Sequence, residues 1–238
     1  MTRHPKVYCA ADTPDTARAL EIARAMVTAQ CGLKIGMEFF NAQGQQGLRA
    51  IVEQYPTLDI FLDLKFHDIP NTVAGAVRAV SLLRPSYINV HALGGPAMMK
   101  AARAAAQEGD HKPRLLAVTL LTSMDEDSCA AIGLPLPLKD RVVQLARAAQ
   151  DAGLDGVVCS AHEIEAIRTA CGPDFILMVP GIRPATHEMG SDDQKRVMTP
   201  VQALQTGATH LVIGRPITGA DDPAAAAQSI LHDIEKSA

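Results

Sequence analysis

The strongest constraint on the fold is a repeated alternation along the chain. Short apolar segments typical of buried strands are followed by longer segments with helical spacing, and this happens eight times. Strands that alternate with helices predict a parallel sheet, and eight units predict a closed (β/α)8 TIM barrel. A doubly wound open sheet is the alternative, although it usually has fewer strands. No stretch resembles an interdomain linker, so we expect one domain over residues 1–238. The expected strands are 7–12, 32–36, 60–66, 87–91, 114–122, 156–160, 175–180 and 210–214.

Capping residues predict where the helices begin. Thr13 is a possible N-cap, with Pro14 at the first helical position. The segment 181–198 is polar and too long for a simple connector, which favours a mobile lid. The expected helices are 13–30, 37–55, 71–83, one that opens at Gly94-Gly95-Pro96, 137–152, 162–170, one from Thr199-Pro200 to Gly207, and one that opens at Asp222-Pro223.

Composition limits the possible partners and the compartment. The formal net charge of −4 argues against nucleic acid or a membrane surface as the main partner, so a bound anion must be held by a local cluster. The five cysteines are scattered and show no C-x-x-C spacing, which fits reduced thiols. The sequence shows neither a secretory leader nor an apolar run long enough to span a bilayer. We therefore expect a soluble, cytoplasmic protein.

The strand expected at 60–66 carries an unusual pair of charges. Side chains alternate faces along a strand, so Asp63 and Lys65 share one face while the apolar residues between and beside them share the other. The apolar face suits packing against helices, and the charged face then points into the barrel. Buried charge is costly unless it is paired or used. Asp68 follows the strand on a loop, where Ile69-Pro70 ends it.

Polar residues gather where the expected strands end. In a (β/α)8 barrel these carboxyl ends form the active-site face. Lys34 is flanked by apolar residues, and a closed barrel has no edge for a solvated lysine, so function is favoured there. Asp63 and Lys65 could instead form a structural ion pair, and His91 could be a hydrogen-bonded core residue. Helix capping would explain Asp12, Ser160 and one of Thr122 and Ser123. The full set is Asp12, Lys34, Asp63, Lys65, His91, Thr122, Ser123, Ser160, Pro180, Arg183, Gly214 and Arg215.

The last two strands suggest a phosphate site. Gly214 and Arg215 follow the eighth strand, and Arg183 follows the seventh, which is where barrels of this type often bind phosphate. An arginine fork matches phosphate oxygens. Two surface arginines are the structural alternative, but their shared location favours a phosphorylated substrate.

Metal and nucleophile chemistry have weaker support. His67 and His91 with Asp63 could form a metal site, but no H-x-x-x-H or Cys/His cluster accompanies them. No G-x-S-x-G elbow is present. Lys65 could form a Schiff base, yet a lysine close to two aspartates should stay protonated. A protonated lysine is better placed to donate a proton.

The motifs together resemble the bacterial form of orotidine 5′-monophosphate decarboxylase, over almost the whole chain. The most specific element is Asp63-x-Lys65-x-x-Asp68 within DLKFHDIPNT, although D-x-K-x-x-D alone is shared with related sugar-phosphate decarboxylases. The supporting motifs follow in the same order: LKIG, LLTSM, GLDGVVCSA, VPGIRP, MTPVQAL and IGRPIT. Family members often read A-L-D near the start, where this chain reads Ala10-Ala11-Asp12 and keeps the aspartate.

The resemblance implies a homodimer whose active sites each receive Asp68 and Thr72 from the partner. It implies loss of carbon dioxide from orotidine 5′-monophosphate to give uridine 5′-monophosphate, the last step of de novo pyrimidine synthesis, without metal or organic cofactor. Lys65 would be the proton donor. The implied charged array is Lys34, Asp63, Lys65 and Asp68; the implied substrate contacts are Asp12, Lys34 and Thr72 at the ribose, Thr122 and Ser123 at the pyrimidine, and Pro180, Arg183, Gln194, Gly214 and Arg215 toward the phosphate.

Three alternatives stay open. The first is a metal-dependent sugar-phosphate decarboxylase or aldolase of the same barrel group, which a magnesium requirement would reveal. The second is a phosphopentose epimerase-like isomerase, which needs a histidine-rich metal site. The third is a catalytically silent nucleotide-binding barrel, which would have no need for the charges at Lys34, Asp63, Lys65 and Asp68.

Overall fold

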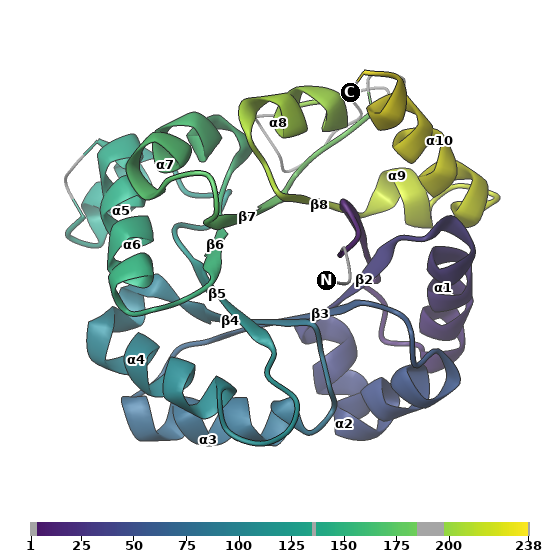
Figure 1. Ribbon diagram of the computed structural model, residues 1–238, viewed down its shortest axis with the longest axis horizontal. Helices are drawn as coiled ribbons and strands as arrows, with labels where there is room; N and C mark the ends of the chain where they lie inside the picture. The colour runs from purple at the N-terminus through teal and green to yellow at the C-terminus, as the bar shows by residue number, and fades with distance from the viewer. Residues whose placement is uncertain (1–3, 135–136, 185–197, 238) are drawn as a thin grey trace.

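Eight parallel strands close into a barrel in sequence order, with β8 paired to β1, as predicted (Figure 1). The computed structural model describes residues 4–134, 137–184 and 198–237. The strands are β1 (Val7–Ala10), β2 (Gly32–Gly36), β3 (Ile60–Phe66), β4 (Tyr87–His91), β5 (Arg114–Val118), β6 (Gly156–Val158), β7 (Ile176–Pro180) and β8 (His210–Ile213).

Helices surround the barrel and cover its outer face (Figure 1). The sequence pattern missed two short helices, α5 (Glu126–Ala131) after β5 and α9 (Arg215–Thr218) after β8. The helices are α1 (Thr16–Ala29), α2 (Met37–Gln54), α3 (Pro70–Ser81), α4 (Gly95–Ala106), α5 (Glu126–Ala131), α6 (Leu138–Asp151), α7 (Ile164–Cys171), α8 (Pro200–Thr206), α9 (Arg215–Thr218) and α10 (Pro223–Lys236), with 3-10 turns η1 (Ala92–Gly94) and η2 (Ala161–Glu163).

Several predicted boundaries were wrong at the carboxyl end of the strands. The strand expected to reach Asp12 ends at Ala10, and the one expected to reach Thr122 ends at Val118. The first helix is capped by Asp15, whose side chain accepts a hydrogen bond from Ala17 N, and not by Thr13. Asp12 and Thr122 therefore lie on loops, which frees their side chains to face a ligand. Of the expected lid, residues 185–197 lie outside the described part, and Ile182 forms an isolated parallel bridge with Met198.

The core has two compartments separated by the sheet. The larger one fills the space between strands and helices with aliphatic side chains and alanines. The smaller one fills the barrel interior and includes the aromatic rings of Tyr8, Phe61 and Tyr87. Glycine at position 32 makes room for the Tyr8 ring, which a Cβ there would overlap. The interior is thus packed below the site, so a ligand can enter only from one end.

Buried polar groups close the amino end of the barrel. The Nδ1 atom of His210 lies 2.7 Å from the Pro5 carbonyl oxygen, which can only accept. His210 Nδ1 therefore carries the proton, and Nε2 accepts from the Tyr87 hydroxyl at 3.0 Å. Burial lowers the pKa of His210 to about 4. Nearby, Asp59 accepts from His4 and Ser86. These groups satisfy one another, as expected for a structural network.

No helix in the described segments is both long and apolar enough to cross a bilayer.

Candidate active site

Four charged side chains form a continuous array at the carboxyl ends of β1, β2 and β3. Lys34 Nζ lies 2.8 Å from Asp12 Oδ1 and 3.6 Å from Asp63 Oδ2. Lys65 Nζ lies 2.7 Å from Asp63 Oδ1. The strand register produces this order, because Ala10 is level with Lys34 and Gly36 is level with Asp63. Positive and negative groups therefore alternate across three neighbouring strands.

The absence of a side chain at Gly36 leaves room for the array. A Cβ at this position would lie 3.0 Å from Lys34 Nζ and 3.2 Å from Asp12 Oδ1. Contacts that close would shift the end of one of the two side chains by a few tenths of an ångström. Gly36, the last residue of β2, therefore leaves room for the Asp12–Lys34 ion pair.

Asp63 is the most enclosed carboxylate of the array. Burial alone would raise its pKa, but the ammonium groups of Lys34 and Lys65, with hydrogen bonds from Lys65 and Asn89, hold the pKa below its usual range. Two opposite charges about 4 Å apart attract by about 4 kcal/mol at an effective dielectric near 20, which offsets much of the desolvation cost. Asp63 therefore stays ionised, and both lysines converge on one negative centre.

The backbone at Lys65 departs from a regular strand. Its φ is +51°, in the left-handed region, which costs a residue other than glycine roughly 1–2 kcal/mol. The pairing with β4 shifts here: Leu62 pairs with Ile88, and Phe66 with Val90. The expectation of strict alternation from Leu62 to Phe66 was therefore wrong at this point. The irregularity nevertheless leaves Lys65 on the same side as Asp63, and such bulges often aim active-site side chains.

The array opens into a cavity of about 310 Å³, large enough for a small ligand. Asp12, Lys34, Asp63 and Lys65 form one wall. The rest of the lining comes from the strand ends and following loops on the far side of the barrel. Those residues are Thr122, Val158, Pro180, Gly181, Ile182, Arg183, Val212, Gly214, Arg215 and Pro216, with Ala10 and Phe61 below.

Two arginines lie at the end of the cavity formed by β7 and β8. Arg183 is buried and follows β7, whereas Arg215 is exposed and follows β8. Gly214 lies beside Arg215, and its closest neighbour for a Cβ is Ala10 at 3.6 Å. Guanidinium groups from two adjacent strands give this end a local positive charge on a chain that is negative overall. An anionic group, held opposite the carboxylates, fits this arrangement.

The structure brings most of the predicted residues together, but not all of them. Ser123 is exposed and does not line the cavity, whereas its neighbour Thr122 does. Asp68 and Thr72 are exposed and lie away from the lining; the Asp68 carboxylate accepts from the backbone N–H of Ile69 at 2.6 Å. Gln194 falls outside the described residues.

At Ser160, Asp12 and His91 the sequence also allowed a purely structural role, and the structure supports that role at some of these positions. Ser160 caps η2 in a reciprocal box with Glu163, as expected. Asp12 does not cap a helix, since it pairs with Lys34 instead. His91 stacks on His67 with ring centroids 5.3 Å apart, and burial together with the nearby His67 and Lys65 lowers its pKa.

Sequence reasoning missed Asn89. This residue is fully buried in β4 and donates from its amide to Asp63 Oδ1 at 2.7 Å. Its side-chain oxygen accepts from the Lys65 backbone N–H at 2.8 Å. A polar amide between the apolar residues Ile88 and Val90 of the expected strand was the available signal.

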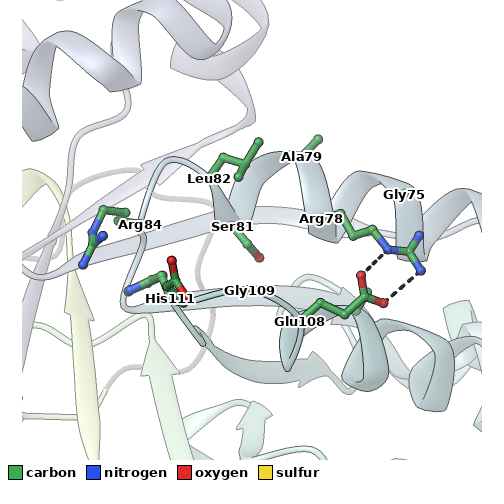
Figure 2. A pocket seen from close by; sticks show the side chains of 11 residues that line it. Gly75, Arg78, Ala79, Ser81, Leu82, Arg84, Glu108, Gly109 and His111 are labelled. Atoms are coloured by element: carbon green, nitrogen blue, oxygen red, sulfur yellow. Dashed lines mark hydrogen bonds and ion pairs between the residues drawn. The ribbon is translucent and has the colours of Figure 1, made fainter.

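A larger hollow lies outside the barrel, between α3 and α4 (Figure 2). Its volume is about 610 Å³, but its charged side chains include Arg78 and Glu108, which pair with each other at 2.7 and 3.0 Å. The ion pair is solvent-exposed, and no alternating array of charges lines the hollow. This hollow is larger than the cavity at the barrel mouth, but the chemistry favours the barrel mouth, where active sites of this fold lie.

Possible metal ligands do not cluster. Across residues 4–134, 137–184 and 198–237, no group of three or more His, Cys, Asp or Glu side chains could hold a metal ion. The grouping of His67 and His91 with Asp63 that the sequence left open is not among such clusters in the described residues. The two histidines stack on each other instead.

The fold and the site define a class: a closed (β/α)8 barrel that presents a lysine–aspartate array and an arginine-rich end to one cavity. Comparison with known proteins then identifies the family. A family model described as "Orotidine 5'-phosphate decarboxylase / HUMPS family" matches residues 5–230, and the chain belongs to this family.

Individual relatives match over nearly their full lengths. The orotidine 5'-phosphate decarboxylase of Rhodospirillum rubrum is 50% identical over 98% of this chain and 95% of the relative. That of Moorella thermoacetica is 47% identical over 99% and 94%. The crystal structure of orotidine 5'-phosphate decarboxylase from Lactobacillus acidophilus superposes with a TM-score of 0.85 at 36% identity, and covers 97% of this chain and 99% of that one.

Proposed function

We propose that this protein converts orotidine 5′-monophosphate to uridine 5′-monophosphate and carbon dioxide, the last step of de novo pyrimidine nucleotide synthesis. The observation that carries the proposal is the Lys34–Asp63–Lys65 array, which shares one cavity with Arg183 and Arg215. Relatives that are about half identical over nearly their full length are named for this activity. We propose a cytoplasmic location, which suits the buried, unpaired cysteines Cys9, Cys31, Cys129, Cys159 and Cys171.

The chemistry required of the protein is stabilisation of a carbanion. The bond between ring carbon six and the carboxyl carbon breaks, its electron pair stays on carbon six, and carbon dioxide departs. The ammonium of Lys65 donates a proton to carbon six, which completes uridine 5′-monophosphate, and the resulting amine regains a proton from water. Our proposal uses no metal or organic cofactor, so fixed protein charges must supply the stabilisation.

Magnitudes indicate which charge matters most. Asp63 close to the substrate carboxylate would repel it by about 4 kcal/mol at 4 Å and an effective dielectric near 20. Such repulsion helps only to the extent that it fades in the transition state. Enzymes lower barriers by roughly 8–23 kcal/mol, so repulsion is too small to carry the reaction. Moreover, Asp63 is already compensated by Lys34, Lys65 and Asn89. Stabilisation of the carbanion by Lys65 is the larger effect.

The opposite end of the cavity would bind the phosphate. Arg183 and Arg215 provide donors, and Pro180 and Gly214 shape the same end. Thr122 would face the pyrimidine, with Ser123 on the same loop, while Asp12 and Lys34 would contact the ribose. By family resemblance, Gln194 would also contact the phosphate. Phosphate binding far from the reacting carbon can be used to orient the ring and exclude water.

We propose that the working unit is a homodimer with shared sites. Asp68 lies on the exposed loop before α3 and Thr72 in the exposed first turn of that helix, both away from the cavity of their own chain. Ile69 between them is a large apolar side chain that is 66% exposed, which suits burial against a second copy. A second copy could bring its Asp68 next to Lys65 and extend the alternation of charges. This arrangement would complete the site from two chains.

Mixing two inactive variants tests the shared site. Lys65→Ala and Asp68→Ala protomers each lose activity, but a mixed dimer keeps one intact site. After subunit exchange at equal concentrations, activity should recover to about a quarter of wild type, because half of the dimers are mixed. Absence of recovery despite exchange, confirmed by mass spectrometry of differently tagged chains, would contradict the shared site while leaving the reaction untouched.

The direct test of the activity is the loss of orotidine 5′-monophosphate ultraviolet absorbance with purified protein in excess EDTA. Rapid loss with uridine 5′-monophosphate as the product supports the proposal. The family description also covers a second branch. No loss in EDTA, together with turnover of a sugar phosphate once magnesium is restored, would overturn the proposal in favour of a metal-dependent sugar-phosphate enzyme.

A further inference from the structure

Asn89 occupies the one position opposite the irregular part of β3. The pairs on either side of it, Leu62 with Ile88 and Phe66 with Val90, leave Asn89 alone on β4 facing residues 63–65. Three residues of one strand therefore face a single residue of the next. Backbone groups in such a bulge lose their regular partners, and a side chain must replace them.

The Asn89 side chain replaces one of these backbone partners with one end of its amide and binds the Asp63 carboxylate with the other. Its oxygen accepts from the Lys65 backbone N–H at 2.8 Å, and its nitrogen donates to Asp63 Oδ1 at 2.7 Å. The orientation of the amide is unambiguous, because a backbone N–H can only donate and a carboxylate can only accept. Asn89 has no exposed surface and does not line the cavity, so it has no path to a bound ligand.

We propose that Asn89 is a positioning residue that sets the Lys65 ammonium against Asp63. Asn89 holds the left-handed backbone of Lys65 from one side and the carboxylate that pairs with its ammonium from the other. A lysine side chain has four rotatable bonds, so fixing both its backbone and its ionic partner removes much of the freedom of the proton donor. This inference deepens the proposed function and rests on it, since Lys65 is the donor there.

Residues similar to asparagine cannot do both tasks. Aspartate at position 89 could accept from Lys65 N–H, but its second oxygen would lie against Asp63 Oδ1 and repel it unless one carboxyl took up a proton. Alanine could do neither and would leave the Lys65 N–H buried without an acceptor. The two replacements therefore fail in different ways, and only the aspartate failure depends on pH.

The experiment compares the full-length Asn89→Ala and Asn89→Asp variants with wild type and with Thr119→Val. Thr119 is the matched control because it is equally buried near the end of the next strand, and its hydroxyl donates to the Val158 carbonyl rather than to the array. For Asn89→Ala we expect kcat to fall by about 10- to 100-fold with KM within about threefold. Thr119→Val should keep kcat within about twofold.

The pH dependence of kcat distinguishes the positioning role from a simple packing role, because loss of packing alone would not change it. In Asn89→Asp, kcat relative to wild type should rise as the pH is lowered, because a protonated carboxyl can again donate to Asp63. A flat ratio, or Asn89→Ala with wild-type kcat, would overturn the proposal. If wild type turns over orotidine 5′-monophosphate and Asn89→Ala does too at the same rate, the positioning role fails while the proposed function stands.

A measurement without substrate tests the positioning role of Asn89 separately from the proposed decarboxylase activity. Lysine labelled with 15N at Nζ gives a Lys65 resonance that can be assigned by its absence in Lys65→Arg. We expect this resonance to shift in Asn89→Ala and to stay in place in Thr119→Val. An unchanged resonance in Asn89→Ala would overturn the positioning role, and a shifted one would support it, whether or not the wild-type protein decarboxylates orotidine 5′-monophosphate.

Discussion

At the amino end of the barrel, Tyr87 and His210 bond to each other and to the backbone, whereas at the carboxyl end Lys34 and Lys65 converge on Asp63 beside a cavity. Both clusters bury polar groups in a barrel whose interior is otherwise apolar. The first holds Tyr87 and His210 by hydrogen bonds within the protein. The second leaves two cations at a surface that a ligand can reach.

The difference shows how one barrel separates stability from chemistry. A neutral histidine and a tyrosine carry no net charge, so burying them costs little once they are hydrogen-bonded. An array of formal charges costs more to bury and is worth keeping where it acts on a substrate. Substitutions at the two ends should therefore change different quantities: turnover at the carboxyl end, and free energy of unfolding at the amino end.

The largest effect should come from Lys65→Ala. Because the variant lacks both the proton donor and the main stabilising charge, kcat should fall by at least about 10⁴-fold. Circular dichroism and thermal unfolding should show an intact fold. Steady-state assays would check the loss, with Lys100→Ala on the exposed face of α4 as the control. A near-normal kcat would remove Lys65 as the acid.

Arg215→Ala should come next. Loss of one charge-assisted phosphate contact should lower kcat/KM by about 10²-fold, mainly through KM. Exogenous guanidinium ions should restore part of the lost kcat/KM if the phosphate end acts as proposed, because they replace the missing cation. Unchanged kcat/KM would refute the phosphate role. The matched arginine control is Arg84→Ala, because Arg84 lines the hollow between α3 and α4 and not the cavity at the barrel mouth.

At the amino end, His210→Gln should change acid stability and not turnover. The pKa of His210 is about 4 in the folded chain and near 6.5 when unfolded. As the pH falls from 6.5 to 4, only the unfolded chain gains this proton, so the free energy of unfolding decreases by about 3 kcal/mol. His4, Asp59, Tyr87 and Arg114 surround the ring and remain in the variant.

Urea unfolding at pH 7.0 and about pH 4.5 measures this contribution. Wild type should lose more stability between the two values than His210→Gln does. Asp59 and Asp63 also have lowered pKa values, but carboxylates of this kind lose their stabilising effect mainly below the usual carboxyl pKa of about 3.9, which lies outside this pH range. Identical losses in the two proteins would show that His210 does not titrate in this way.

The smallest effect should follow Arg78→Ala in the hollow between α3 and α4 (Figure 2). Its pair with Glu108 is solvent-exposed, and exposed pairs contribute little. Turnover and KM should stay within about twofold of wild type. A large loss of activity would mean that the larger hollow, and not the barrel mouth, is the site.

The sequence alone determined the barrel, because eight strand–helix units with short connections leave few other ways to cover both faces of a parallel sheet. It also placed Lys34, Asp63, Lys65, Arg183 and Arg215 at strand ends, where a parallel barrel brings them to one face. These predictions depend on local periodicity and on one rule of topology. Both can be read from the printed residues.

Only the tertiary structure decided how these residues are held. Asp12 pairs with Lys34 rather than capping a helix, and Asn89 accepts from the Lys65 backbone N–H while it donates to the Asp63 carboxylate. These contacts depend on register between strands far apart in sequence, where a shift of one residue turns every side chain to the opposite face. Local pattern carries no information about such a register, so barrel closure is what fixes the partners of each charge.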